Sequence, residues 1–450
     1  LLEAADLRVV VVSPLAREPY FHEEFAARGV AVEPLPKTRG GFLERRLKDL
    51  RFYLWSEREL TSTFRIKRKT EFSPWGVWWR DLVARRLRGL GITEDRIGRW
   101  ELAIFRAPKI SRLYDEYRPD AILFTKLFST NIHMVKEAKR RGVKTICFLE
   151  AWDNLTSKGP LAVVPDILLV WNQFMKQEAV EYHGFPPDRV RVVGIPQFDV
   201  YHDPNKFLSR KDFFERYGLD PSRKLLTYAV AAGEIAPTDP DVIEMLYQAV
   251  ISGRVTTPAQ ILIRLHPQTR GRHLEKFNRF RGRPGIAIQP AGRVARIQDG
   301  WDPSWDDMIR LSETMYHSNV VLNVGSTISL DAIAFDTPVV AIGFEGDGQR
   351  DYFESYRRYY DYTHLKRIVE SGGLRIAQSF DEMLHAVNRY LKDPSLDARG
   401  RERVRAEQFC FLDGRSGRRS ARAILTELDL APAADFPHAQ AGRPEQPSRS

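Results

Sequence analysis

The amino-acid sequence predicts an α/β protein with two doubly wound domains. Short apolar runs recur along the chain, each is followed by a helical pattern of apolar residues, and turn-forming residues separate the two. Strands and helices that alternate in this way are typical of parallel sheets covered by helices on both faces. The expected strands are Arg8–Val12 and the start of a second strand at Gly29–Val32, with a helix between them, followed by Ala121–Thr125, Val143–Leu149, Asp166–Trp171, Val190–Val193, Leu225–Ala229, Gln260–Leu265, Val320–Leu322 and Val339–Ile342.

A polar segment marks the boundary between the two domains of this 450-residue chain. We expect the N-terminal domain at 1–200 and a linker at 201–219, where Asp, Pro, Asn and Lys cluster. The C-terminal domain is expected at 220–395, with closing helices at 396–430. Residues 431–450 are rich in Pro, Ala, Gly and Ser, a composition that predicts a disordered tail.

The overall composition is that of a globular protein, with 43% hydrophobic and 28% charged residues. No run of about eighteen apolar residues occurs, so no transmembrane helix is predicted. Cys147 and Cys410 have neither the spacing of a disulfide framework nor that of metal ligands. A reducing cytoplasm is therefore the expected location, with a peripheral position at the inner face of the membrane as an option.

One segment, residues 37–88, is strongly basic. It holds fifteen Lys or Arg against six Asp or Glu, in a chain whose net charge is +10. Leucines recur in it at helical spacing between basic residues. Trp75, Trp78 and Trp79 follow, with arginines directly after them.

This basic segment admits two interpretations. A basic amphipathic helix with interfacial tryptophans suits an anionic membrane surface, which residues 42–88 would contact. The alternative is a helical insertion, at about 37–115, that packs on the N-terminal domain and exposes a solvated basic face. No nucleic-acid-binding module accompanies the charge, so no nucleic-acid partner is expected.

A small-residue turn, Gly325-Ser326-Thr327, lies where an apolar strand passes into a helix that extends to Phe335. Such a turn directs unpaired backbone N–H groups, and the positive end of the helix dipole, at whatever lies on it. Phosphate is a common occupant of such a place. The alternative is that Gly and Ser only make a tight turn between strand and helix.

A second group of polar residues follows the strand Gln260–Leu265. Arg264, His266 and Pro267 stand at the carboxyl end of this strand, and ligands of open α/β sheets bind outside such ends. We expect Arg264 and His266 to converge with Ser326 and Thr327 on one anionic group, a diphosphate.

The segment from Arg264 to Pro267, together with the Gly325-Ser326-Thr327 turn, resembles the nucleotide-binding half of GT-B glycosyltransferases. The pattern is similar to that of CDP-glycerol glycerophosphotransferases, bacterial polysialyltransferases and capsule sugar transferases, and UDP-GlcNAc 2-epimerases share the same half. The resemblance implies a GT-B fold, in which two Rossmann-like domains face each other across a cleft. It also implies that the C-terminal domain binds a CMP-, CDP- or UDP-linked donor and that Asp331 reaches the ribose hydroxyls. The N-terminal domain would then bind a glycan or lipid-linked acceptor.

The loop from Glu150 to Gly159 follows another predicted strand and carries two carboxylates, an indole, hydroxyls and an ammonium group. In it Trp152, Thr156 and Lys158 resemble a W-H-G-T-P-L-K-like loop of the CDP-glycerol transferases and are candidates for the acceptor side of the cleft. Asp153 stands where that family has its histidine.

Two carboxylates of this loop are candidates for proton transfer. A carboxylate can deprotonate an acceptor hydroxyl, so Asp153 is the candidate general base and Glu150 the reserve. The alternative is that Asp153 and Asn154 only shape a turn.

No metal site or obligatory cofactor is predicted. The one Asp-x-Asp pattern, at Asp239 and Asp241, indicates the start of a helix, and no His or Cys cluster has ligand spacing. The charge of a leaving diphosphate would then be met by the helix dipole, Arg264 and His266.

These features together predict a glycosyltransferase-like enzyme that transfers a sugar or polyol phosphate from a nucleotide-activated donor to a surface-polysaccharide or lipid-linked acceptor. One alternative is a UDP-sugar 2-epimerase, which is disfavoured because Ser13 to Arg17 replaces the G-T-R-P-E-like loop of those enzymes. Another is a non-catalytic nucleotide-binding or membrane-adaptor protein.

Overall fold

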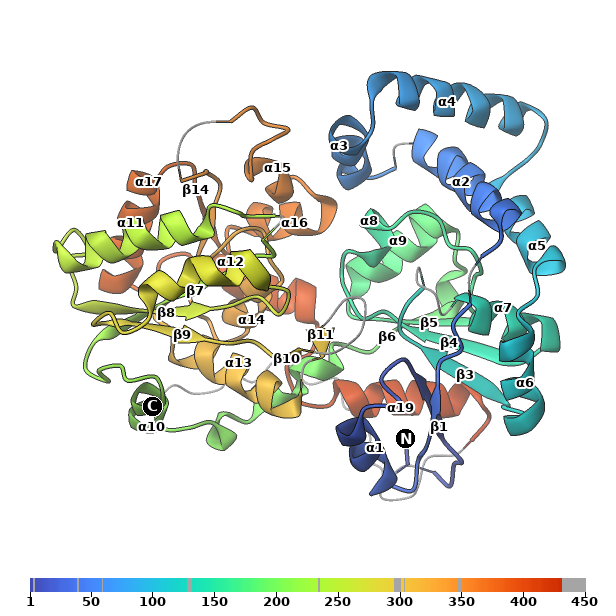
Figure 1. The fold of residues 1–450 in the computed structure, drawn as a ribbon, viewed down its shortest axis with the longest axis horizontal. Coiled ribbons are helices and arrows are strands. Elements are labelled where there is room, and N and C mark those ends of the chain that lie inside the picture. The colour runs from blue at the N-terminus through green and yellow to red at the C-terminus, as the bar shows by residue number, and fades with distance from the viewer. Residues whose placement is uncertain are drawn as a thin grey trace. The chain divides into compact units, whose positions relative to one another are not determined.

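The computed structural model describes residues 1–2, 5–38, 40–58, 60–127, 132–233, 235–294, 301–302, 304–346 and 350–430 (Figure 1). The chain divides into two compact units: unit 1 holds Leu1–Pro196 and the helix that follows Arg415, and unit 2 holds Gln197–Gly414. The segment expected to be a linker, 201–219, belongs to unit 2. The tail at 431–450 lies outside the described residues.

The sheet of unit 2 has a Rossmann-type strand order. Its strands, all parallel, lie in the order β14-β13-β12-β7-β8-β9. Counted along the chain, the first strand of this sheet, β7, therefore lies at the centre beside the fourth, β12. Ligands of such sheets bind at this switch point, outside the carboxyl ends of the strands. The bounds are β7 Lys224–Ala229, β8 Ala259–Arg264, β9 Ile286–Gln289, β12 Val320–Asn323, β13 Val339–Ile342 and β14 Arg375–Ala377.

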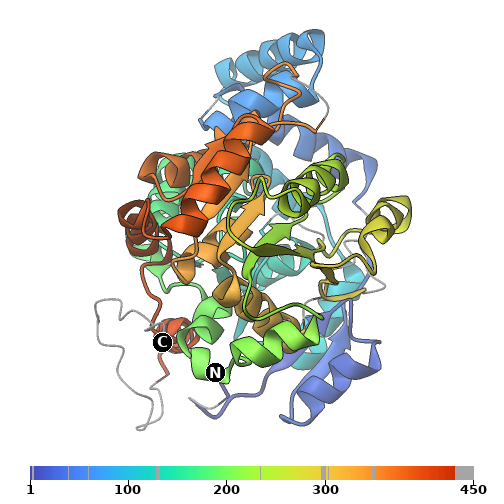
Figure 2. The ribbon, with the colours of Figure 1, turned by 90° about the vertical axis from the view of Figure 1, so that its left-hand side faces the viewer.

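Helices cover both faces of this sheet, as Figures 1 and 2 show. Alternate residues of a strand point to opposite faces; accordingly Leu226 and Tyr228 of β7 pack in the core under α11 and α17, whereas Leu225 packs with Phe213 and Phe214 of α10. Each of the four strands β7, β8, β12 and β13 is buried over most or all of its length, which explains their almost uninterrupted apolar runs. The helices of unit 2 are α10 Arg210–Arg216, α11 Asp239–Ile251, α12 Gly271–Glu275, α13 Trp305–His317, α14 Ile328–Ala334, α15 Arg357–Tyr360, α16 Thr363–Ser371, α17 Phe380–Lys392 and α18 Ala398–Val404.

Short elements complete unit 2. Arg293–Val294 and Trp301–Asp302 pair as the antiparallel strands β10 and β11. Turns of 3-10 helix occupy Pro196–His202, Pro204–Lys206 and Lys276–Phe280, and a π-helical turn, Arg405–Phe409, follows α18.

Unit 1 contains a parallel sheet whose strands follow chain order: β3 Ala121–Phe124, β4 Lys144–Phe148, β5 Ile167–Val170 and β6 Val190–Val192. The strands expected near the N-terminus, β1 Val10–Ser13 and β2 Ala31–Pro34, instead form a separate parallel pair with α1 Pro19–Ala26 between them. Both strands of this pair are only partly buried, which distinguishes them from the interior strand β5. The remaining helices of this part are α7 Ile132–Arg141, α8 Asn154–Ser157, α9 Gln173–His183 and a 3-10 turn at Pro187–Arg189.

The C-terminal helix α19, Ser416–Glu427, packs on the sheet of unit 1. Its Ile424 lies in one core cluster with residues of β4 and β5, and the Arg419 guanidinium donates to the carbonyl oxygen of Val193. Gly194, with φ +86°, lies so close that an added Cβ would stand 2.5 Å from the Ser416 hydroxyl. A residue other than glycine would therefore force α19 away from the sheet.

Residues 42–117 form the predicted helical insertion, which comprises α2 Phe42–Glu57, α3 Ser62–Glu71, α4 Pro74–Gly89, α5 Glu94–Ile104 and α6 Pro108–Tyr117. Thr61, Ser73 and Thr93 cap three of these helices, because each side chain accepts a backbone N–H of the first turn. Among the described residues, no helix combines the length and apolar character needed to cross a bilayer.

A buried ion cluster joins the insertion to the sheet-covering helix α7. The Lys136 ammonium, which is almost fully buried, donates to Glu44 of α2 at 2.8 Å and to Glu101 of α5 at 2.9 Å. Arg51 adds a contact of 3.4 Å to Glu101. Removing one partner of such a cluster leaves an uncompensated buried charge.

We predict that Lys136→Met lowers the free energy of unfolding by about 3–5 kcal/mol, because Glu44 and Glu101 stay buried and lose the ammonium that bonds both of them. Urea unfolding of both proteins measures the difference. Lys109→Met, which changes an exposed lysine of α6, is the matched control and should leave stability within about 0.5 kcal/mol. Equal midpoints for the Lys136 variant and the wild type would show that the cluster does not anchor the insertion.

Candidate functional site

Three turns meet at the carboxyl edge of the unit 2 sheet. They follow β7, β8 and β12, and β7 is hydrogen-bonded to both of the others. Because neighbouring strands lie about 4.8 Å apart, the turns after β8 and β12 are separated by roughly 10 Å, with the turn after β7 between them. The sheet therefore brings the predicted residues His266, Ser326 and Thr327 to one edge of one unit.

Gly325 adopts a left-handed conformation, with φ +44°. An added Cβ would lie 3.1 Å from the Cβ of Tyr359, and the Gly325 N–H donates to the hydroxyl of Tyr360 at 3.1 Å. The same hydroxyl donates to the carbonyl oxygen of Ile342 at the end of β13. Two tyrosines thus fix the turn from behind, and its shape requires glycine.

Ser326 and Thr327 supply donors at the front of this turn. The Ser326 hydroxyl oxygen accepts the Ile328 N–H at 3.3 Å, so its own proton remains for another acceptor. Thr327 is exposed, and within the described residues its backbone N–H has no partner. Behind them the side-chain oxygen of Asn323 accepts the Ser326 N–H. The buried Nδ2 of Asn323 makes no hydrogen bond with any residue that the structure describes. The turn can therefore hydrogen-bond an oxyanion.

His266 is held in one tautomer. Its Nδ1 accepts the backbone N–H of Gln268 at 3.1 Å, so in the neutral ring the proton is on Nε2. Burial lowers the pKa of His266, which favours the neutral ring at pH 7. The side chain therefore presents an N–H donor and no positive charge.

Arg264 lies deeper than expected. Its guanidinium is buried, donates to Gln289 at 2.7 Å and contacts Asp307 at 3.4 Å. It points to the face of the sheet that α13 covers, because it is the last residue of β8 and shares the side of Leu262. The expected direct contact of Arg264 with a diphosphate is not offered by this arrangement.

Asp331 is also buried, one turn into α14. It accepts the Tyr201 hydroxyl at 2.5 Å, and burial raises its pKa to about 6, against the field of nearby Arg264. The carboxylate is engaged inside unit 2, so the contact with ribose hydroxyls that the resemblance implied is not available in this conformation.

The turn after β7 depends on a residue whose role the sequence did not reveal. Asp239 is buried at the start of α11; it accepts the Tyr228 hydroxyl at 2.8 Å and the Ala231 N–H at 2.9 Å. Gly233 completes the turn, and an added Cβ there would lie 2.7 Å from the ring of His273. From the sequence, the Asp-x-Asp pattern indicated only the start of a helix. The role of Asp239 could not be inferred, because its partner Tyr228 lies in the preceding strand.

The loop from Glu150 in unit 1 holds the two candidate carboxylates. Asp153 accepts the Ser157 hydroxyl at 2.6 Å, and the Lys158 ammonium lies 4.0 Å from it. Glu150 accepts the Thr125 hydroxyl at 3.3 Å and lies 3.7 Å from the ammonium of Lys126, a residue that the sequence did not single out. Burial raises the pKa of the Glu150 carboxyl, which moves it toward the range of a general base.

The other residues predicted in this loop divide by burial. Trp152 and Thr156 are buried, and the Thr156 carbonyl oxygen accepts the Thr61 hydroxyl of the insertion at 2.9 Å. Lys158 is half exposed. Trp152 and Thr156 thus support the loop from inside, whereas Lys158, Asp153 and Glu150 retain exposed surface.

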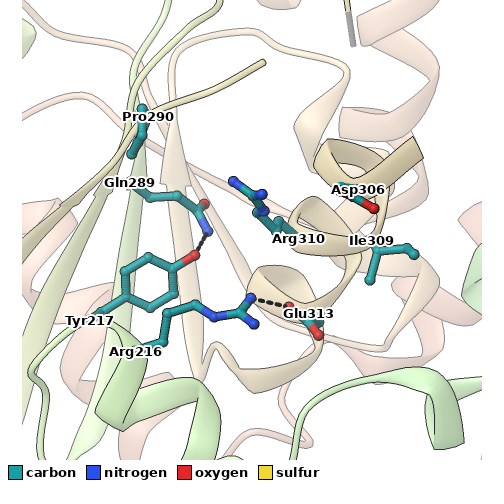
Figure 3. A pocket seen from close by; sticks show the side chains of 8 residues that line it. All are labelled: Arg216, Tyr217, Gln289, Pro290, Asp306, Ile309, Arg310 and Glu313. Atoms are coloured by element: carbon teal, nitrogen blue, oxygen red, sulfur yellow. Dashed lines mark hydrogen bonds and ion pairs between the residues drawn. The ribbon is translucent and has the colours of Figure 1, made fainter. Parts of the chain in front are cut away.

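A pocket of about 540 Å³ lies beside the carboxyl end of the edge strand β9, between α10 and α13 (Figure 3). Figure 3 shows the Arg310 side chain extending from α13 toward Gln289, the residue that also accepts from Arg264. The pocket is lined by Arg216, Tyr217, Gln289, Pro290, Asp306, Ile309, Arg310 and Glu313. None of the residues predicted at the site lines it. Among the described residues, no group of three or more His, Cys, Asp or Glu side chains could hold a metal ion.

Comparison with known proteins identifies the fold. No known family profile matches the chain, and no curated protein sequence matches it. Solved structures do match: a Listeria monocytogenes protein provisionally assigned as a UDP-N-acetylglucosamine 2-epimerase shares 13% identity at a TM-score of 0.52, over 96% of this chain and 98% of that one. The S. aureus MnaA–UDP co-structure shares 14% identity at a TM-score of 0.52, over 94% of this chain and 98% of that one. The UDP-GlcNAc 2-epimerase from Neisseria meningitidis bound to UDP-GlcNAc shares 12% identity at a TM-score of 0.50, over 94% of this chain and 100% of that one.

The predicted fold class is confirmed. The chain has the two-domain α/β architecture, with parallel sheets, that these structures share. Identities of 12–14% establish the fold alone.

We predict that the stability of unit 2 depends on the protonation of Asp239. Burial raises its pKa from 3.8 to about 7, so the folded state disfavours the charged form. The contribution of the neutral carboxyl to the free energy of unfolding is fully present below pH 4. This contribution is lost as the pH rises through about 7, and the total loss is up to about 4 kcal/mol.

Asp239→Asn should abolish this pH dependence, because the amide stays neutral, accepts the Ala231 N–H and donates to the Tyr228 oxygen. Urea unfolding at pH 4.5 and pH 8 measures it. Asp241→Asn, on the exposed side of the same helix, is the control and should keep the wild-type slope. An Asp239 variant with the wild-type slope would contradict the assignment.

Proposed function

We propose that this chain is a nucleotide-sugar-dependent transferase. It takes a glycosyl group, or a polyol phosphate, from a CMP-, CDP- or UDP-linked donor and passes it to a hydroxyl of a surface-polysaccharide or lipid-linked acceptor. The observation that carries the proposal is the set of free donors at the switch point of unit 2: the His266 Nε2–H at one strand end and the Ser326–Thr327 turn at another. The strands that carry these donors, β8 and β12, lie roughly 10 Å apart with β7 between them, a spacing that a diphosphate hydrogen-bonded at both ends can bridge.

The comparisons support a uridine nucleotide as the first ligand to test. The S. aureus structure contains UDP and the Neisseria structure contains UDP-GlcNAc, each in a fold that this chain shares. Donors with cytosine and guanine bases belong in the same test.

In the transfer of a sugar, the acceptor oxygen bonds to the anomeric carbon, the bond from that carbon to the phosphate oxygen breaks, and the nucleotide leaves with the electron pair: a nucleoside diphosphate from a CDP- or UDP-linked donor, or CMP from a CMP-linked donor. In the transfer of a polyol phosphate from a CDP-linked donor, the acceptor oxygen bonds to the distal phosphorus, the P–O–P bridge breaks, and CMP leaves. In each case the growing charge of the leaving group is met by donors that are fixed before the reaction. A carboxylate of unit 1 takes the acceptor proton. Asp153 is the first candidate for this general base. Glu150 is the second, because burial raises the pKa of its carboxyl toward the range of a general base. No obligatory metal ion is part of the proposal.

A UDP-sugar 2-epimerase is the second candidate, favoured by the structural likeness to 2-epimerases. Incubation with UDP-GlcNAc distinguishes the two activities. An epimerase forms the C2 epimer without an acceptor, whereas a transferase releases UDP at a rate that depends on the acceptor.

Donor binding should weaken when His266 is changed. We expect His266→Ala to raise the Kd of the nucleotide-sugar about 10- to 100-fold, because a hydrogen bond to a charged group contributes about 1.5–3 kcal/mol. Calorimetric titration with CMP-, CDP-, UDP- and GDP-linked sugars measures it. A ligand at a hundred times its Kd should also stabilise the wild type by about 2.7 kcal/mol.

His385→Ala, which changes an exposed histidine of α17, is the matched control and should bind as the wild type does. Failure of the wild type to bind any of these donors would refute the proposed function. Unchanged binding by the His266 variant would remove this residue from the site.

Transfer should require a carboxylate of the 150–158 loop. We expect Asp153→Asn or Glu150→Gln to lower kcat about 10²- to 10⁴-fold while the Kd of the donor is retained, since the donor groups lie in unit 2. Asp188→Asn, an exposed carboxylate elsewhere in unit 1, is the control. If both variants turn over like the wild type, the proton leaves by another route.

A further inference from the structure

The outer face of α4 exposes three tryptophans. The exposed fractions of Trp75, Trp78 and Trp79 are 79%, 54% and 59%. Their spacing places them on one side of the helix, and their rings form a cluster, with centroids 5.9 and 6.1 Å apart. A contiguous exposed apolar patch of this kind commonly marks a site that contacts a partner.

The opposite face of α4 already fixes the helix to the insertion. Ala84 is fully buried in a core with Leu54 and Ile97, and the Arg88 guanidinium donates to the carbonyl oxygen of Leu54 at 2.6 Å. The one carboxylate of α4, Asp81, is paired with Arg68 at 2.7 Å. The contacts that fix α4 to the insertion therefore include a buried core on the side of the helix opposite the tryptophans.

Positive charge continues the aromatic stripe along the helix. Arg85 and Arg86 follow Trp78 and Trp79 by seven positions, which returns them to the same side. The side chain of Arg85 is 68% exposed and lies 3.8 Å from Glu57 of α2, whereas Arg86 has no ion pair within the described residues. The outer face thus combines indoles with arginines, while Asp81, the one carboxylate of α4, is paired with Arg68.

We propose that the outer face of α4 binds an anionic lipid bilayer. Indoles prefer the boundary between head groups and acyl chains, where the ring is apolar and its N–H stays hydrated. Arginines beside them reach the phosphates, and each basic residue near an anionic surface strengthens binding about fivefold. The arginines beside the indoles favour an anionic bilayer as the occupant of this face, because such a surface attracts both groups at once. The inference goes beyond the proposed function and does not depend on it.

Co-sedimentation of the full chain with phosphatidylcholine vesicles, with and without about 30% phosphatidylglycerol, tests the proposal. We expect binding that requires the anionic lipid and weakens from low to high salt, because such attraction decays over a Debye length of about 8–10 Å. The triple variant Trp75→Ala, Trp78→Ala, Trp79→Ala should bind at least tenfold more weakly. Arg85→Glu with Arg86→Glu should bind more weakly and should lose most of the salt dependence.

Trp305→Ala is the matched control, since it removes an equally exposed tryptophan from α13 of unit 2. Because the changed side chains are exposed, circular dichroism and thermal unfolding should match the wild type. Quenching of the tryptophan fluorescence by brominated lipid, lost in the triple variant alone, would locate the contact.

Three results would overturn the proposal. One is the absence of vesicle binding at low salt, and another is equal binding by the triple variant. The third is a dimer or an RNA complex of the lipid-free protein that the triple variant abolishes, because the occupant of the face would then be a second copy or a nucleic acid.

Discussion

The central position of β7 in the unit 2 sheet is the constraint on which the candidate site depends. Because β7 pairs with β8 on one side and β12 on the other, the turns that follow all three strands emerge at one edge. The helices after β7 and β12 cover opposite faces of the sheet, which opens the edge between them. A different strand order would place the same residues on separate parts of the surface.

Buried polar groups beneath this edge hold the turns in shape. Asp239 fixes the turn after β7, Tyr360 fixes Gly325, and Asn323 holds the Ser326 N–H. Each group costs desolvation free energy that its hydrogen bonds only partly return. Donors held in this way need little reorganisation when a ligand arrives, so the cost is consistent with a binding role.

Much of the fold follows from the sequence because buried parallel strands leave a clear signal. The predicted strands Leu225–Ala229 and Val339–Ile342 differ from β7 and β13 by at most one residue. The helical insertion was also predictable, since leucines at helical spacing define its inner side. The separate pairing of β1 with β2 was not, because a βαβ pattern gives no information about which further strand its sheet joins.

The position of the candidate site at the strand ends could be predicted from the sequence, but the orientation of several of its side chains could not. Small residues and His266 at strand ends could be recognised from local sequence alone. The inward orientation of Arg264 and Asp331 could not, because their partners stand far away in the chain: Asp307 for the first and Tyr201, 130 positions earlier, for the second. Sequence reasoning places a residue on an element; the packing of distant elements decides whether its side chain reaches a ligand.

A crystal structure of the chain with UDP tests the position of the donor site directly. We expect diphosphate oxygens about 2.7–3.2 Å from His266 Nε2 and from the Ser326–Thr327 turn, while Arg264 stays bound to Gln289 and Asp331 to Tyr201. A diphosphate bound instead in the pocket beside Gln289 and Arg310, with the switch-point turns empty, would contradict this position of the donor site.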